Sequence, residues 1–278
     1  MKYQWLIFKT ALMFFTRIPV GANLPYSTSL LQASARYFSW VGILVGIVGG
    51  AVLILATQLF SPPLGIAFSM LATILLTGSF HEDGFADCCD AFGGGWTPEK
   101  ILTIMKDSRL GTYGVVGLIA VLSFKFLLLL ELFNYFPVTT VAMVLIAGHS
   151  SSRFFSTTIM QQLPYVQDID ASKSKPLADR RLTKSEMLMS VTGTVLPLLL
   201  LYSGDYLNPT ILEFTNTRMN PTVYFVLIAL IPPVITRFFA ARFFKKWIGG
   251  YTGDCLGATQ QICEIAFYIG CLLLWKFI

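Results

Sequence analysis

The chain has 278 residues, of which 55% are hydrophobic and only 13% are charged, and its mean hydropathy is +0.67. In soluble domains about a quarter of the residues are charged, so this composition excludes an ordinary soluble protein and indicates an integral membrane protein. The net charge is +5 at neutral pH. The five cysteines form no CxxC pair and no metal-binding spacing, so we expect buried free thiols.

Apolar runs along the chain predict about seven transmembrane helices, because each approaches the roughly 20 residues with which a helix crosses a bilayer. Gly42 and Gly46, four residues apart in the first run, predict close contact with another helix. A further apolar stretch at about 4–20 is interrupted by basic residues and a proline, which predicts an amphipathic helix on the membrane surface. We therefore expect an all-α, polytopic membrane helix bundle that forms one domain over residues 1–278. The predicted spans are 38–60, 64–80, 113–133, 138–158, 188–204, 222–240 and 262–278.

Most basic residues lie in segments that seven spans would place on one side of the membrane. Of the 20 lysines and arginines, only Lys125, Arg218 and Lys276 fall elsewhere. The positive-inside rule therefore predicts a cytoplasmic N-terminus and cytoplasmic basic loops. Such a one-sided positive field suits anionic lipid headgroups and anionic substrates, although membrane orientation alone accounts for most of these residues.

Four carboxylates, Glu82, Asp83, Asp87 and Asp90, stand directly after the second predicted span. The three aspartates are spaced i, i+4, i+7, so on a helix they share one face. Like charges on one face repel one another unless a cation lies between them, and oxygen ligands suit a hard divalent ion such as Mg²⁺. This acidic face therefore predicts metal-assisted chemistry on an anionic substrate.

A basic segment with a glycine-rich turn follows closely. Lys106 and Arg109 flank Asp107, and Gly111 and Gly114 come next. The cationic side chains and open backbone N–H groups are suited to phosphate oxygens. In the alternative interpretation, Asp107 pairs with Lys106 or Arg109 and the glycines only turn the chain.

A third glycine-rich segment, residues 249–258, lies between the last two predicted spans, and Asp254 is its lone carboxylate. Glycines there let the backbone approach a ligand closely. Glu264 lies two to three turns deeper, and Arg153 ends the fourth span, where it is a candidate phosphate clamp. Ionisable residues within a membrane are functional candidates by default.

Together these segments resemble the cobalamin synthase family, the adenosylcobinamide-GDP ribazoletransferases. The resemblance covers nearly the whole chain and is carried by HEDGFADCCD at 81–90, MKDSRLGTYG at 105–114, GYTGDCLGA at 250–258, FTRIPV at 15–20 and Ser152-Arg153. Two departures stand outside the core motifs. The loop at 161–187 is longer and more basic than in shorter members, and Gln261 stands where some members carry an acid.

The resemblance implies a magnesium-dependent enzyme of the bacterial inner membrane, with its active site facing the cytoplasm. The 5′ oxygen of α-ribazole, or of its 5′-phosphate, would displace GMP from adenosylcobinamide-GDP and form adenosylcobalamin or its 5′-phosphate. The implied partners are the corrinoid nucleotide, α-ribazole and the lipid bilayer, with no nucleic acid. The oligomeric state, including a homo-oligomer, stays open.

Phosphoryl transfer depends on positioning and charge neutralisation, which suits this residue set. One carboxylate not fully engaged by metal would accept the proton of the attacking hydroxyl, and Asp90, the last of the acidic face, is favoured. The expected metal ligands are Asp83, Asp87, Asp90 and Asp254, the expected catalytic residues are Asp90, Asp83, Asp87 and Asp107, and the expected phosphate- or substrate-binding residues are Lys106, Arg109, Arg153, Glu82 and Glu264.

Two other protein classes fit parts of the pattern. CDP-alcohol phosphotransferases also combine an Asp-Gly helix with Mg²⁺ and a nucleotide leaving group, but Ala86-Asp87 stands where their motif has Ala-Arg. A cation-coupled transporter would carry acids near the middle of its spans. Here Glu131 and Glu264, the acids in or near the predicted spans, both lie towards span ends. Phospholipid-type synthesis is therefore the runner-up and transport a remote alternative.

Overall fold

The computed structural model describes residues 2–21, 24–25, 27–166, 180–203 and 221–277. Within these ranges the chain is built from helices, and its one β-type contact is an isolated bridge between Tyr165 and Tyr251. The all-α prediction is therefore confirmed. The described cysteines are free, as expected, and all but the half-buried Cys89 are buried.

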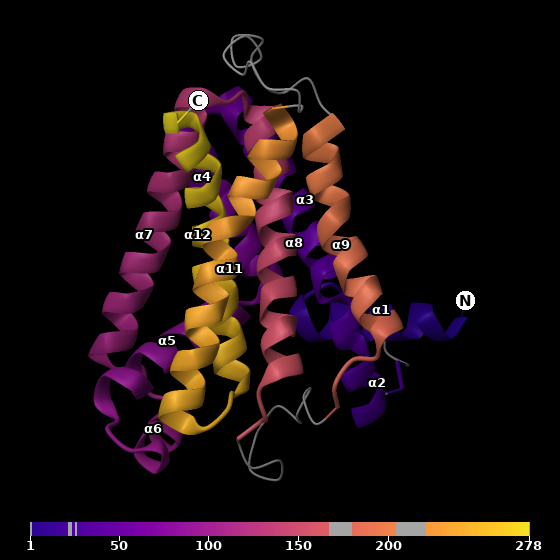
Figure 1. Ribbon diagram of the computed structural model, residues 1–278. Coiled ribbons are helices and arrows are strands. Elements are labelled where there is room, and N and C mark those ends of the chain that lie inside the picture. Colours follow the sequence, from indigo (N-terminus) through magenta and orange to yellow (C-terminus); the bar gives the residue numbers. More distant parts are fainter. Residues whose placement is uncertain (1, 22–23, 26, 167–179, 204–220, 278) are drawn as a thin grey trace.

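Seven long helices run side by side along the bundle (Figure 1). They are α3 (Phe38–Leu59), α4 (Pro62–Thr77), α7 (Thr112–Tyr135), α8 (Val138–Gln162), α9 (Lys184–Ser203), α11 (Pro221–Ile248) and α12 (Gly253–Phe277). The shorter elements are α1 (Lys2–Phe15), α2 (Thr28–Ser34), the 3-10 turn η1 (Ala35–Tyr37), α5 (Phe80–Gly94) and α6 (Pro98–Met105). Each of the seven predicted spans thus coincides with one long helix.

Five helices within the described ranges are long and apolar enough to cross a membrane by themselves, and a sixth crossing is possible if the bent pair α4–α5 forms one span. The α8 helix has 25 residues but is not among these five, because His149, Arg153 and several serines lower its hydropathy. Most of α8 is buried against other helices, so these polar groups do not face lipid. A multi-pass membrane bundle is confirmed, whereas the count of seven spans stays a prediction.

The three motif segments meet at one end of the bundle. Figure 1 shows α5, α6 and the turn between α11 and α12 at the lower end, and the C-terminus at the upper end. The α1 helix lies crosswise to the long helices, and its 14 residues are too short to cross a bilayer. It buries Ile7, Ala11 and Phe15 and exposes Tyr3 and Trp5, so it is amphipathic as predicted.

Glycines on α3 allow close approach of α8. A Cβ on Gly46 would lie 2.5 Å from the Cα of Ile146, and a Cβ on Gly42 would overlap the carbonyl oxygen of His149. Both distances are shorter than van der Waals contact allows, so the two helices pack backbone to backbone at these positions. The close packing predicted from the Gly42 and Gly46 spacing is confirmed.

We expect Gly46→Ala to destabilise the protein by about 1–3 kcal/mol, because the added methyl group forces the backbones of α3 and α8 apart. Thermal unfolding of the detergent-purified protein measures this. Gly253→Ala is the matched control, since a Cβ there meets no atom within 4 Å. Equal melting temperatures for the two variants would contradict the packing argument.

Candidate functional site

The acidic helix α5 begins at a sharp break in the chain. Gly78 ends α4 in the left-handed conformation, with φ of 67°, and Ser79 follows with φ of 59°. Two successive left-handed residues stop the helix, and α5 leaves at 88° to α4. As a result α5 lies across the end of the bundle, and Glu82 and Asp83 stand in its first turn, where the helix dipole favours negative charge.

The α5 helix crosses the start of α12 at two glycines. A Cβ on Gly84 would lie 3.0 Å from the Cα of Asp254, and a Cβ on Gly257 would lie 3.2 Å from the carbonyl oxygen of His81. Gly257 of the third segment therefore allows a helix to approach closely. This crossing places Asp254 beside the acidic face of α5.

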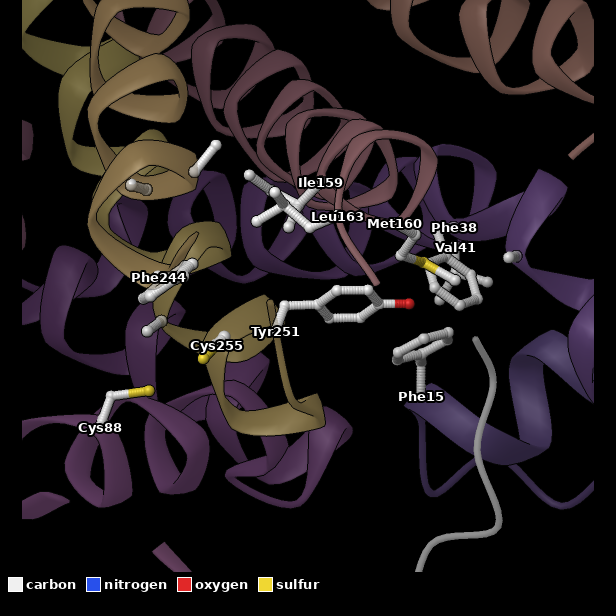
Figure 2. Packing of buried hydrophobic residues seen from close by; sticks show 14 of the residues in the cluster. Phe15, Phe38, Val41, Cys88, Ile159, Met160, Leu163, Phe244, Tyr251 and Cys255 are labelled. Carbon is white, nitrogen blue, oxygen red and sulfur yellow. The ribbon is translucent and has the colours of Figure 1, made fainter. Parts of the chain in front are cut away.

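The turn before α12 packs into a buried hydrophobic cluster. Figure 2 shows Tyr251 among Leu163, Met160 and Phe15, with Cys255 on the next turn of the chain. Tyr251 is fully buried, and its N–H donates to the carbonyl oxygen of Pro164 at 2.9 Å. The turn between α11 and α12 is therefore fixed to the end of α8, and Asp254 is fixed with it.

The carboxylates at the crossing influence one another. Asp83 is exposed, whereas Asp87 and Asp254 are half-buried. Burial, and then the nearby carboxylates of Asp254 and Asp83, raise the pKa of Asp87 to about 7. A bound cation would relieve this repulsion.

Among the described residues, no three His, Cys, Asp or Glu side chains stand close enough together to hold a metal ion by themselves. Mg²⁺ is commonly held by one or two carboxylates together with water and substrate phosphates. One or two of the carboxylates of Asp83, Asp87 and Asp254 meet this requirement chemically, and a complete protein cage is not required.

Asp90 has a different environment from the other aspartates. Its Oδ2 accepts from the N–H of Gly111 at 2.7 Å, and its Oδ1 accepts from the N–H of Gly114 at 2.8 Å. A Cβ on either glycine would clash with this carboxylate. Asp90 thus caps the N-terminus of α7, and the backbone N–H groups that were expected to bind phosphate are already occupied.

The basic segment after α6 is exposed. Arg109 donates to Asp107, with an Nη2–Oδ2 distance of 2.6 Å, and these hydrogen bonds hold the pKa of Asp107 at about 2. The part of the alternative interpretation in which Asp107 pairs with a basic neighbour is confirmed for Arg109, whereas Gly111 and Gly114 do more than turn the chain, because their N–H groups donate to Asp90. Lys106 is also exposed, so a ligand can reach both cations from solvent while Arg109 stays paired with Asp107.

Arg153, Glu264 and Glu82 lie in the bundle interior. Arg153 is 3% exposed and donates from Nη1 to the carbonyl oxygen of His149 in its own helix. Glu264 is fully buried and forms an ion pair with Lys125 at 2.5 Å. All three side chains are buried, on α8, α12 and α5 respectively, so the structure does not support direct substrate contact for them.

Sequence reasoning did not identify Lys125 as the partner of Glu264. The sequence did indicate that Lys125 has a partner, because a lysine in the middle of an apolar run needs a counter-charge. The helix that supplies the counter-charge depends on tertiary packing, which the spacing along the chain does not give.

Comparison with known proteins identifies close relatives along nearly the entire chain. The sequence model of the cobalamin-5-phosphate synthase family matches residues 7–272. An adenosylcobinamide-GDP ribazoletransferase of Vibrio cholerae is 41% identical over 273 residues, which cover 97% of this chain and 94% of the relative. One of Shewanella amazonensis is 41% identical and covers 99% of this chain and 98% of its own. One of Leptospira interrogans is 38% identical, with coverages of 98% and 97%. No solved structure matches the chain.

We expect Asp90→Asn to destabilise the protein by about 1–3 kcal/mol, because the amide NH₂ would face one of the two backbone N–H donors and leave it unpaired. Asp83→Asn is the control: Asp83 is exposed, so its replacement should change the melting temperature little. Thermal unfolding in detergent compares the two. If Asp90→Asn melts at the temperature of Asp83→Asn, the carboxylate does not cap α7.

Proposed function

Because the chain belongs to the cobalamin-5-phosphate synthase family, we propose that it transfers the adenosylcobinamide-phosphate group from adenosylcobinamide-GDP to α-ribazole or its 5′-phosphate. The chain is a multi-pass membrane transferase of cobalamin biosynthesis. In the proposed reaction, a ribose hydroxyl of the acceptor attacks the phosphorus next to the corrinoid arm, the bond from that phosphorus to the bridging pyrophosphate oxygen breaks, and GMP leaves. Because the 5′ oxygen of α-ribazole 5′-phosphate is already esterified, a hydroxyl other than the 5′ one serves both acceptors. The family match favours this activity over phospholipid-type synthesis and over transport.

The observation that carries the proposal is the placement of the acidic face of α5 against Asp254 at the start of α12. The two motifs are about 170 residues apart in the sequence and share one end of the bundle (Figure 1). Phosphoryl transfer requires few covalent roles from the protein, and it depends on positioned charges around the transferred group. Carboxylates beside exposed cations form such an arrangement.

Each residue has a proposed role in binding or proton transfer. Asp83, Asp87 and Asp254 would hold Mg²⁺, which, when bound, neutralises charge on the pyrophosphate and on the leaving GMP. Lys106 and Arg109, both exposed, would bind phosphate oxygens, and Asp107 orients Arg109. The proton of the attacking hydroxyl would pass to Asp83 or Asp87 in preference to Asp90, because Asp90 already accepts two backbone hydrogen bonds.

The location of the reaction follows from the charge distribution. The acidic face lies at the end of the bundle that carries most of the basic loops, which the positive-inside rule assigns to the cytoplasm. We therefore propose an enzyme of the bacterial inner membrane whose site opens to the cytoplasm. The soluble nucleotide substrates would reach it from there, and the corrinoid would not need to cross the membrane.

Detergent-purified protein supplied with adenosylcobinamide-GDP, α-ribazole and Mg²⁺ should form adenosylcobalamin and GMP. Asp83→Asn should lower kcat by about 100-fold or more, since it removes a proposed ligand of the cation that neutralises transition-state charge. Glu99→Gln, an exposed carboxylate on α6, is the control and should keep wild-type turnover. Absence of turnover by folded wild-type protein would refute the substrate assignment.

A further inference from the structure

A buried polar cavity lies directly behind the acidic face of α5. It has a volume of about 10 Å³, and its walls come from six helices, namely α3, α4, α5, α7, α8 and α12. This volume is close to the minimum that one water molecule needs. Burying polar groups inside a membrane bundle costs free energy unless the groups are hydrogen-bonded, so the side chains around this cavity should be bonded to one another or to water.

The deep side of the cavity is anchored by Glu264. Its Oε1 accepts from Lys125 on α7 at 2.5 Å and from the Tyr268 hydroxyl at 2.8 Å. Its Oε2 accepts from Gln260 at 2.6 Å, and Gln260 also donates to the Ser152 hydroxyl on α8 at 3.1 Å. These bonds tie α7, α8 and α12 together, so this side of the cavity is rigid.

The shallow side of the cavity is formed by Glu82 on α5. Its Oε1 accepts from Nε2 of Gln261 on α12 at 3.0 Å, and the two residues are 9% and 2% exposed. Glu82 therefore points into the bundle, whereas Asp83, the next residue of the same helix, is exposed. The rotation of α5 about its own axis decides which of these two carboxylates faces outward.

Five polar atoms of residues that line the cavity have no hydrogen-bond partner within the described part of the chain. They are Oε2 of Glu82, Oε1 of Gln260, Oε1 of Gln261, Nε of Arg153 and Nε2 of His149. The oxygens can only accept, and the Arg153 nitrogen can only donate. A buried water makes about three hydrogen bonds, so one water in this cavity would satisfy part of this set.

We propose that Glu82 is a positioning residue: its bond to Gln261 at the edge of this polar cavity fixes the rotation of α5 so that Asp83 and Asp87 face Asp254. Glu82 is then neither a metal ligand nor a substrate ligand, although it adjoins Asp83 in the sequence. This inference deepens the proposed function and depends on it for its kinetic test. The geometry of the pair itself does not depend on the activity.

The kinetic test compares Glu82→Gln, Glu82→Ala and Gln261→Ala in the transfer assay. Glu82→Gln keeps an acceptor for Gln261, so it should retain at least about a third of the wild-type kcat. Glu82→Ala and Gln261→Ala each remove the bond, so each should lower kcat by about tenfold and raise the half-saturating Mg²⁺ concentration by a similar factor. Loss of stability alone would lower the melting temperature without changing the Mg²⁺ requirement at temperatures where the protein stays folded.

The opposite pattern would overturn the inference. If Glu82 contacts metal or substrate, Glu82→Gln should be as inactive as Glu82→Ala, and Gln261→Ala should be close to wild type. A second measurement needs no activity: the melting-temperature losses of Glu82→Ala and Gln261→Ala should be less than additive in the double variant. Additive losses refute the pair, whereas an inactive wild type with coupled losses refutes only the proposed function.

Discussion

The close crossing of α5 over α12 is the constraint on which the site depends. Helices with side chains at the contact stand 8–10 Å apart, and the absence of a Cβ at Gly84 and Gly257 permits a closer approach. Because the contact is backbone to backbone, a small change in either helix would displace Asp254 from the acidic face. The hydrophobic cluster around Tyr251 and the break at Gly78 and Ser79 both serve this crossing, since each fixes the entry of one of the two helices.

The charged residues near the crossing divide into two layers with opposite requirements. Asp83, Asp87, Lys106 and Arg109 lie at the end of the bundle and reach solvent to different extents, where charged groups can exchange water for a ligand. Lys125 and Glu264 lie inside the bundle, and a buried charge without its partner would be strongly unfavourable. Lys125 and Glu264 therefore neutralise each other within the protein, whereas the charges at the end of the bundle remain accessible to a ligand.

The helical architecture was predictable from the sequence because apolar length determines it. Each predicted span coincides with a long helix, and the spacing of Gly42 and Gly46 correctly indicated the contact between α3 and α8. The interior position of α8 could not be predicted from apolar length. Its polar residues lower its hydropathy, but they bond to neighbouring helices instead of facing lipid, and hydropathy cannot distinguish these two surroundings.

The candidate site was predictable only in part, because helical periodicity gives a shared face but not the group that packs against it. Asp83, Asp87 and Asp90 do lie on one helix, yet α7 presents two backbone N–H groups to Asp90 alone. Arg153 and Glu264 were candidates because they are ionisable residues in or near predicted spans. In the structure, Arg153 donates to the carbonyl oxygen of His149, and Glu264 forms an ion pair with Lys125, both inside the bundle. Identical residue types thus differ in role because of tertiary neighbours far away in the sequence.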